Sequence, residues 1–203
     1  MFVQVIQGQA SNPGALKDAL DRWFRELSPD AGGWLGSTAG VTDDGRFIAL
    51  ARFESEAAAR RNSDRPEQDA WWTETSKLLT GEATFQDSSH VVVDVTGEPD
   101  QAGFVQVMQG RSSDPDRARE LMGQDDAGEW AAFRPDIIGS VAVDHDDGAY
   151  TMAMYFTSEQ EAREGERKEP PPELKAQMEE MNALSVGEPE FLDLRQPWLY
   201  SPK

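Results

Sequence analysis

Two nearly identical heptapeptides, 102 residues apart, decide the fold of this chain. Phe2-Val3-Gln4-Val5-Ile6-Gln7-Gly8 recurs as Phe104-Val105-Gln106-Val107-Met108-Gln109-Gly110, with six of the seven residues identical. The alternation of β-branched residues in both copies predicts a strand. Shortly after each copy stands a helix start, Asn12-Pro13 or Asp114-Pro115, since Asn and Asp cap helices and proline suits the first helical position.

The resemblance between the two halves continues along the chain. Residues 35–60 align with residues 138–163, and the Asp-Asp-Gly tripeptide at 43–45 returns at 146–148. A repeat of about 100 residues indicates a tandem duplication, because solenoid repeats are about 20–50 residues long. We therefore expect two domains, residues 1–96 and residues 103–203, joined by a polar linker at 97–102.

Composition excludes several classes of protein. The 203 residues carry a formal charge of −19 and include no cysteine. The negative charge disfavours nucleic acid and anionic membrane surfaces as partners. The lack of cysteine rules out disulfides, thiolate metal sites and cysteine nucleophiles. The N-terminus lacks the basic start and long apolar core of a signal peptide, and no apolar run could span a bilayer, so we expect a cytoplasmic location.

Each repeat reads as strand, helix, strand, strand, helix, strand. In the first repeat the strands are expected at 2–8, 34–42, 46–54 and 83–95, and the last strand of the second repeat at 189–200. Asp-Gly between two strand-like runs predicts a hairpin, and Ser55 and Ser158 predict the start of the second helix. This order is that of a ferredoxin-like α+β unit, with both helices on one face of an antiparallel sheet.

The duplicated plan resembles the dimeric α+β barrel superfamily, which includes the antibiotic-biosynthesis-monooxygenase-like proteins. The resemblance rests on topology, repeat length and the aromatic residues of the helices, and it covers nearly the whole chain. It implies two ferredoxin-like βαββαβ units whose antiparallel sheets pack face to face as an intramolecular pseudo-dimer barrel. Some members of the superfamily oxidise polycyclic aromatics without a cofactor and some degrade haem. Their catalytic residues have no residue-by-residue match here.

Strand parity yields candidate residues on the face away from the helices. Phe47, Ala49 and Phe53 share one face of their strand and are expected on the helix side, so Arg52 is expected on the other face, as is its counterpart Tyr155. An arginine and a tyrosine suit an anionic or phenolic ligand. The alternative is that Arg52 ends its strand and pairs with an acid such as Glu54.

Gln4 and Gln106 occupy the centre of the first strand of each repeat. A buried amide needs hydrogen-bond partners, so the two glutamines either line a ligand cavity or form structural bonds. Of the two histidines, His90 could act as a base near neutral pH, or be a solvated strand residue. His145 lies in an Asp-rich turn that lacks the spacing of a calcium loop, so no metal site is expected there.

Two functional hypotheses follow. The first is a small-molecule-binding barrel, a cofactor-independent monooxygenase-like enzyme acting on an aromatic or hydrophobic substrate, with Arg52, Tyr155 and His90 as weak catalytic candidates. Its ligand-binding candidates are Gln4, Gln106, Arg52 and Tyr155. The second is a non-catalytic ligand-binding or scaffold protein, because two histidines are a small inventory for acid–base chemistry. No cofactor and no metal are expected, and the chain is expected to be a monomer or weak homodimer.

Overall fold

The computed structural model describes residues 1–95, 97–123 and 128–202, and the chain forms two compact units. The first unit comprises Met1–Val91 and Gln196–Lys203, and the second comprises Val92–Arg195. These units differ from the predicted domains 1–96 and 103–203 by a short segment at the end of each repeat. Thr96 and Lys203, the last residues of the predicted domains, lie outside the described residues.

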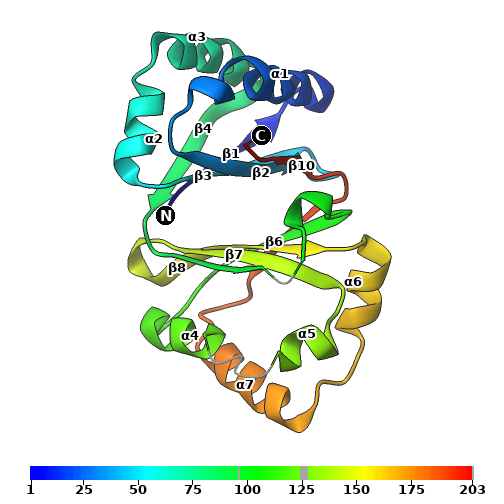
Figure 1. The fold of residues 1–203 in the computed structure, drawn as a ribbon. Coiled ribbons are helices and arrows are strands. Elements are labelled where there is room, and N and C mark those ends of the chain that lie inside the picture. The colour runs from blue at the N-terminus through cyan, green and yellow to red at the C-terminus, as the bar shows by residue number, and fades with distance from the viewer. Residues whose placement is uncertain (96, 124–127, 203) are drawn as a thin grey trace. The chain divides into compact units, whose positions relative to one another are not determined.

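The first unit is a five-stranded sheet with helices on one of its faces (Figure 1). Its strand order is β10-β2-β3-β1-β4, and neighbouring strands are antiparallel. The elements are β1 (Phe2–Ala10), α1 (Pro13–Glu26), β2 (Trp34–Val41), β3 (Arg46–Phe53), α2 (Glu56–Ser63), α3 (Pro66–Thr75), β4 (Leu79–Ser88) and β10 (Trp198–Tyr200), with 3-10 turns at Ser28–Asp30 and Ser76–Leu78.

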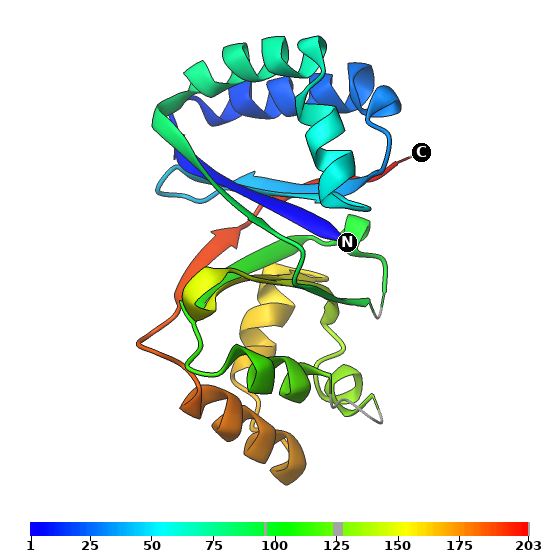
Figure 2. The ribbon, with the colours of Figure 1, turned by 90° about the vertical axis from the view of Figure 1, so that its left-hand side faces the viewer.

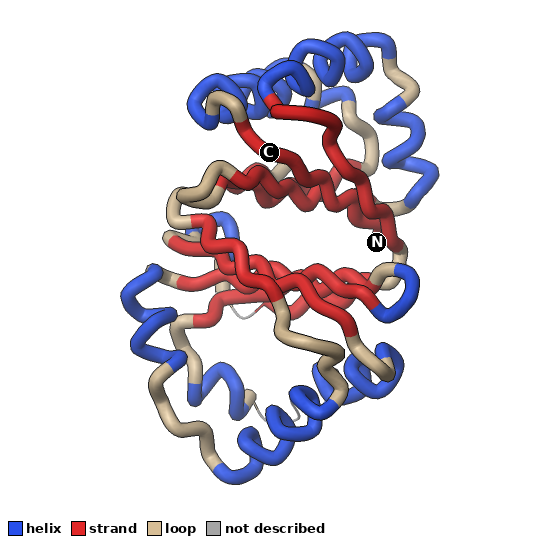
Figure 3. The backbone as a smooth tube through the Cα atoms, turned by 180° about the vertical axis from the view of Figure 1, so that it is seen from behind, coloured by secondary structure: helices blue, strands red, loops and turns tan. Residues whose placement is uncertain are grey.

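The second unit repeats this plan with the strand order β5-β7-β8-β6-β9. Figure 3 shows its helices gathered on one face of its strands, as in the first unit. The elements are β5 (Val91–Val95), β6 (Phe104–Arg111), α4 (Pro115–Met122), α5 (Glu129–Phe133), β7 (Ile137–Asp144), β8 (Ala149–Phe156), α6 (Glu159–Glu166), α7 (Pro172–Ala183) and β9 (Glu190–Leu194), with 3-10 turns at Pro99–Gln101 and Asp146–Gly148. The chain is thus α+β, with two ferredoxin-like units.

Local signals act as the sequence predicts. The hydroxyl groups of Ser55 and Ser158 accept hydrogen bonds from the backbone N–H of Ala58 and Glu161 and cap α2 and α6. Gly45 turns the hairpin between β2 and β3 with a φ of 85°, a backbone conformation that glycine adopts without strain.

The prediction of one last strand in each repeat is wrong. In each repeat the predicted segment forms two strands, and these two strands join different sheets. In the first repeat, β4 belongs to the first sheet and β5 to the second. In the second repeat, β9 stays in the second sheet, while β10 pairs with β2 of the first sheet, seen as the red end of the chain beside light-blue β2 in Figure 2. Pro197 separates β9 from β10, and proline cannot donate a ladder hydrogen bond.

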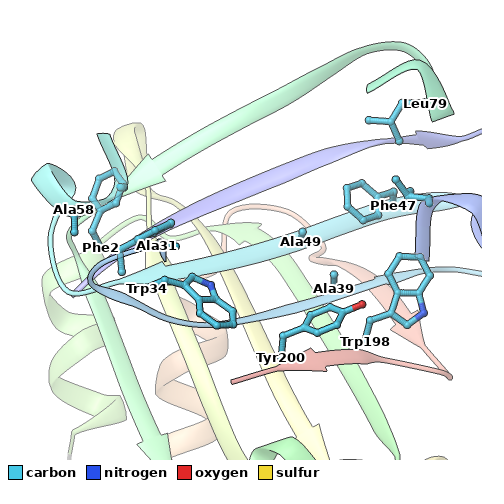
Figure 4. Close-up of a cluster of buried hydrophobic side chains, with 13 residues drawn as sticks. Phe2, Ala31, Trp34, Ala39, Phe47, Ala49, Ala58, Leu79, Trp198 and Tyr200 are labelled. Carbon is cyan, nitrogen blue, oxygen red and sulfur yellow. The ribbon is translucent and has the colours of Figure 1, made fainter. Parts of the chain in front are cut away.

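The core of the first unit lies between its sheet and its helices. Phe47, Ala49 and Phe53 of β3 belong to this cluster, which confirms the predicted helix side of that strand. Figure 4 shows Trp34, Trp198 and Tyr200 in the same cluster of buried side chains. The exchanged strand β10 therefore supplies two large aromatic residues to a core at the other end of the sequence.

Candidate functional site

Seven aromatic side chains form a continuous series on the helix side of the first sheet, which we call the aromatic row. They come from helices α1 and α3 and from three strands. In order along the row they are Phe85 of β4, Trp72 and Trp71 of α3, Trp23 of α1, Trp34 of β2, Phe24 of α1 and Tyr200 of β10. Helix α1 places its aromatic residues on the core side because Leu16, Leu20 and Trp23 recur at helical spacing.

Every step of the aromatic row is a direct ring contact. Ring centroids are 5.4 Å apart for Phe85 and Trp72, 6.0 Å for Trp72 and Trp71, and 6.2 Å for Trp71 and Trp23. The row continues from Trp23 to Trp34 at 5.1 Å. Phe24 completes it, at 6.1 Å from Trp34 and 5.3 Å from Tyr200. These separations fall within the 4.5–7 Å range of favourable aromatic pairs.

The two ends of the row differ in exposure. Phe85 is 51% exposed, whereas Trp34 and Tyr200 are 5% and 8% exposed. Trp72, which meets the Phe85 ring edge-on at an interplanar angle of 71°, is half-buried. The row therefore connects the surface between α3 and β4 to the interior of the unit.

Three indole N–H groups of the row have hydrogen-bond acceptors. The indole N–H groups of Trp23, Trp34 and Trp71 donate to Gln68 Oε1 at 2.6 Å, Ser37 Oγ at 3.0 Å and the backbone oxygen of Ala19 at 3.0 Å, respectively. These bonds fix the orientation of the rings, since a buried indole N–H requires an acceptor.

Tyr200 ends the row in a hydrogen bond to a carboxylate. Its hydroxyl group donates to Asp21 Oδ1 at 2.7 Å, and Lys17 Nζ lies 2.7 Å from Asp21 Oδ2. Burial and the neighbouring carboxylate raise the pKa of Tyr200 well above its usual value. Burial opposes charge on Asp21 as well, but hydrogen bonds from Lys17 and Tyr200 outweigh it and lower the pKa of Asp21. Tyr200 is thus held protonated beside a charged acceptor.

Gln4 and Gln106 lie on the helix side of their sheets, beside the core residues Phe2 and Phe104. Each pairs in register with an aspartate of the neighbouring edge strand. Gln4 Nε2 donates to Asp87 Oδ2 at 3.4 Å, and Gln106 Nε2 donates to Asp193 Oδ1 at 3.0 Å. Gln4 therefore shares a face with the aromatic row, and both glutamines form the structural bonds that were one of the two expectations from the sequence.

Arg52 and Tyr155 lie on the faces of their sheets away from the helices, as strand parity predicts. Arg52 passes over Gly36, where a Cβ atom would lie 2.6 Å from Arg52 Nη2. No ion pair joins Arg52 to Glu54 among the residues that the structure describes. Tyr155 is 2% exposed.

Neither histidine belongs to the aromatic row. His90 is exposed in the connection between β4 and β5, rather than within a strand. His145 Nε2 lies 3.0 Å from Thr151 Oγ1, and burial lowers the pKa of His145 against the opposing effect of Asp144 and Asp146. Within the described ranges, no group of three or more His, Asp or Glu side chains is arranged to hold a metal ion, and no helix is long and apolar enough to cross a bilayer.

Solved structures share this architecture over almost the full chain. A candidate monooxygenase from Lactobacillus acidophilus NCFM is 13% identical, with a TM-score of 0.77 over 98% of this chain and 95% of its own. The chain therefore shares the fold of this candidate monooxygenase. A second candidate monooxygenase, from Fusobacterium nucleatum subsp. nucleatum ATCC 25586, is 7% identical, with a TM-score of 0.73 over 98% of this chain and 94% of its own.

An anthrone oxidase-like protein is 12% identical, with a TM-score of 0.65 over 98% of this chain and 92% of its own. No protein-family model and no curated protein matches the sequence. The three structures therefore show that the fold is shared, and the chemistry must be argued from this chain's own residues.

The two ferredoxin-like units differ at equivalent edge positions. Phe191 of β9 corresponds to Phe85 and is 47% exposed. Asp193 corresponds to Asp87, but it forms an ion pair with Arg163. Among the described residues, no such pair reaches Asp87. In place of a tryptophan pair, the second unit has Met178 on α7.

The second unit also has an open hollow of about 300 Å³ over α4, α5 and α7. It is lined by Leu121, Glu129, Glu173, Leu174, Ala176, Gln177 and Glu180. Sequence reasoning missed this hollow and missed the Tyr200–Asp21 contact. The sequence has no signal for either feature, because each depends on residues brought together from distant segments.

Proposed function

We propose that the protein binds an aromatic or hydrophobic small molecule at the exposed end of the aromatic row and acts on it as a monooxygenase-like enzyme without a bound cofactor. We call this place the outer site and define it by Gln4, Trp72, Phe85 and Asp87. The observation that carries the proposal is the half-exposed Phe85 ring, edge-on to Trp72 beside an aspartate that has no ion pair among the described residues.

The outer site combines an apolar contact surface with one acid and one amide. Phe85 and Asp87 are two residues apart on β4 and so lie about 7 Å apart on the same face. Asp87 accepts a hydrogen bond from Gln4, which holds the carboxylate toward the helix side. Aromatic side chains with a few convergent polar groups are typical of small-molecule sites.

These groups suit the oxidation of an acidic C–H or phenolic ligand. Asp87 would accept the proton, and the Gln4 amide would orient the resulting anion for reaction with O2. For a methylene group flanked by aromatic rings, one oxygen atom replaces the two hydrogens as a carbonyl, and the other leaves as water. The likeness to two candidate monooxygenases and an anthrone oxidase-like protein supports this reaction class.

The test compares equivalent variants in the two units. Binding of anthrone and of 1,4-naphthohydroquinone to the full chain is measured by calorimetry, and O2 uptake by an oxygen electrode with a chelator present. Phe85→Ala should weaken binding by up to about tenfold, the value of one aromatic contact. Phe191→Ala is the matched control in the second unit and should leave binding unchanged.

Asp87→Asn should bind the ligand and lose O2 uptake, while Asp193→Asn should retain it. Equal effects of the paired variants, or failure of both compounds to bind, would contradict the outer site. A carrier without catalysis is the second candidate function, favoured because no histidine is among the residues that define the outer site. Ligand binding that depends on Phe85, with no O2 uptake by the unaltered protein, would establish that alternative.

A further inference from the structure

The first unit concentrates the oxidisable rings of this chain. Five of the six tryptophans belong to it, at positions 23, 34, 71, 72 and 198, and the sequence has no cysteine to act as an easier target of oxidation. In the second unit, Phe104 pairs with Phe156 and Trp130 pairs with Phe133, and these two pairs have no ring in common.

We propose that the aromatic row carries an electron from Tyr200 to a one-electron oxidant at Trp72. The rate of electron tunnelling falls steeply with distance, so a series of rings in direct contact provides short steps where a single jump would be slow. Four tryptophans in contact (Trp72, Trp71, Trp23 and Trp34) form the path, and Phe24 bridges the last of them to Tyr200.

The Tyr200 end of the row is built for the accompanying proton. An oxidised phenol is a strong acid, so a tyrosine loses an electron readily only when a base can take its proton. The Tyr200 hydroxyl already donates to Asp21 Oδ1 at 2.7 Å, and Lys17 compensates the charge on the carboxylate. The proton moves from Tyr200 Oη to Asp21 Oδ1 as the electron leaves the ring.

The oxidant class that fits an enzyme handling O2 and aromatic ligands is an organic peroxyl radical. It gains one electron from the row and becomes a peroxide anion, which takes a proton from water to give a hydroperoxide. Tyr200 becomes a neutral tyrosyl radical and Asp21 a carboxylic acid. The row would thus remove a stray radical from the outer site.

The experiment supplies its own oxidant, so it does not depend on the proposed ligand or reaction. The full chain is illuminated with tris(bipyridine)ruthenium(II) and persulfate, frozen, and examined by electron paramagnetic resonance. The unaltered protein should show a tyrosyl radical, and Tyr200→Phe should leave a tryptophanyl signal. A tyrosyl signal that persists in Tyr200→Phe would place the radical elsewhere and overturn the proposal.

Trp71→Phe interrupts the path and should reduce the tyrosyl signal to the level of Tyr200→Phe. Trp130→Phe is the matched control, because Trp130 is also half-buried and its N–H also donates a hydrogen bond, to Gln177 Oε1, but it lies off the row. Asp21→Asn keeps every ring but removes the proton acceptor, so the tyrosyl signal should again be lost in a folded protein. An undiminished signal in Trp71→Phe and Asp21→Asn would refute the path.

Discussion

Replacing Gly165 of α6 by alanine should destabilise the second unit, although the same change usually stabilises a helix. A Cβ atom at Gly165 would meet the guanidinium group of Arg134, with Cζ at 2.5 Å and Nη2 at 2.7 Å. That group is confined: its Nε and Nη2 donate to Asp136 at 3.0 and 2.7 Å, and the side chains of Arg134 and Asp136 are 10% and 6% exposed. The guanidinium cannot move aside without leaving its partner.

The magnitude follows from two opposing effects. Alanine in place of glycine in a helix favours folding by about 1 kcal/mol. Disrupting a buried ion pair costs about 3–5 kcal/mol, because a charge stays buried without a partner. The net effect of Gly165→Ala is therefore a loss of about 2–4 kcal/mol in the free energy of unfolding.

The assay is urea denaturation of the full chain labelled with 5-fluorotryptophan. Trp130 is the tryptophan of the second unit, so its ¹⁹F signal reports the unfolding of that unit. Gly14→Ala in α1 is the control, since a Cβ atom there meets only Asn12 Oδ1 at 3.6 Å. It should leave stability unchanged or raise it.

A double-mutant cycle isolates the cause. In a background of Arg134→Ala and Asp136→Asn there is no long side chain to displace, so Gly165→Ala should no longer destabilise the unit. A penalty that persists undiminished in this background, or a stabilising effect in the natural sequence, would refute the reasoning.

Three further predictions test other parts of the structure. Burial lowers the pKa of His145 in the folded protein. The stability that the neutral imidazole contributes is therefore present above pH 6.5, the ordinary pKa of histidine, and is lost as the pH falls below 6.5. Thermal unfolding at pH 7.5 and at about pH 5 should therefore show a larger loss for the natural protein than for His145→Gln. Tyr200→Phe should cost about 1–2 kcal/mol and raise the pKa of Asp21, measured by denaturation and by carboxyl NMR, and an unchanged Asp21 titration would contradict the contact. Gly36→Ala should cost about 1–3 kcal/mol, because Gly36 has a φ of 130° and an added Cβ would lie 2.6 Å from Arg52 Nη2; normal stability in denaturation would disprove this close approach.

The candidate site was only partly predictable. Strand parity placed Phe47 and Arg52 on opposite faces of β3, as the structure has them. For Gln4 the sequence left open a cavity lining or a structural bond, and the structure shows a hydrogen bond to Asp87. Most positions on both faces of β1 are at least partly buried. The alternation of its residues therefore does not show which face is turned toward the helices.

Sequence alone determined the duplication, the α+β class and the local turns and caps, because each depends on residues within one short segment. The Asp-Gly hairpin and the serine caps need only their neighbours. Tertiary structure alone decided that β5 and β10 join sheets outside their own repeats. It also decided that Tyr200 meets Asp21 across 179 positions and that Gly165 leaves room for Arg134. Such contacts depend on the register and packing of distant segments, which no local pattern of residues encodes.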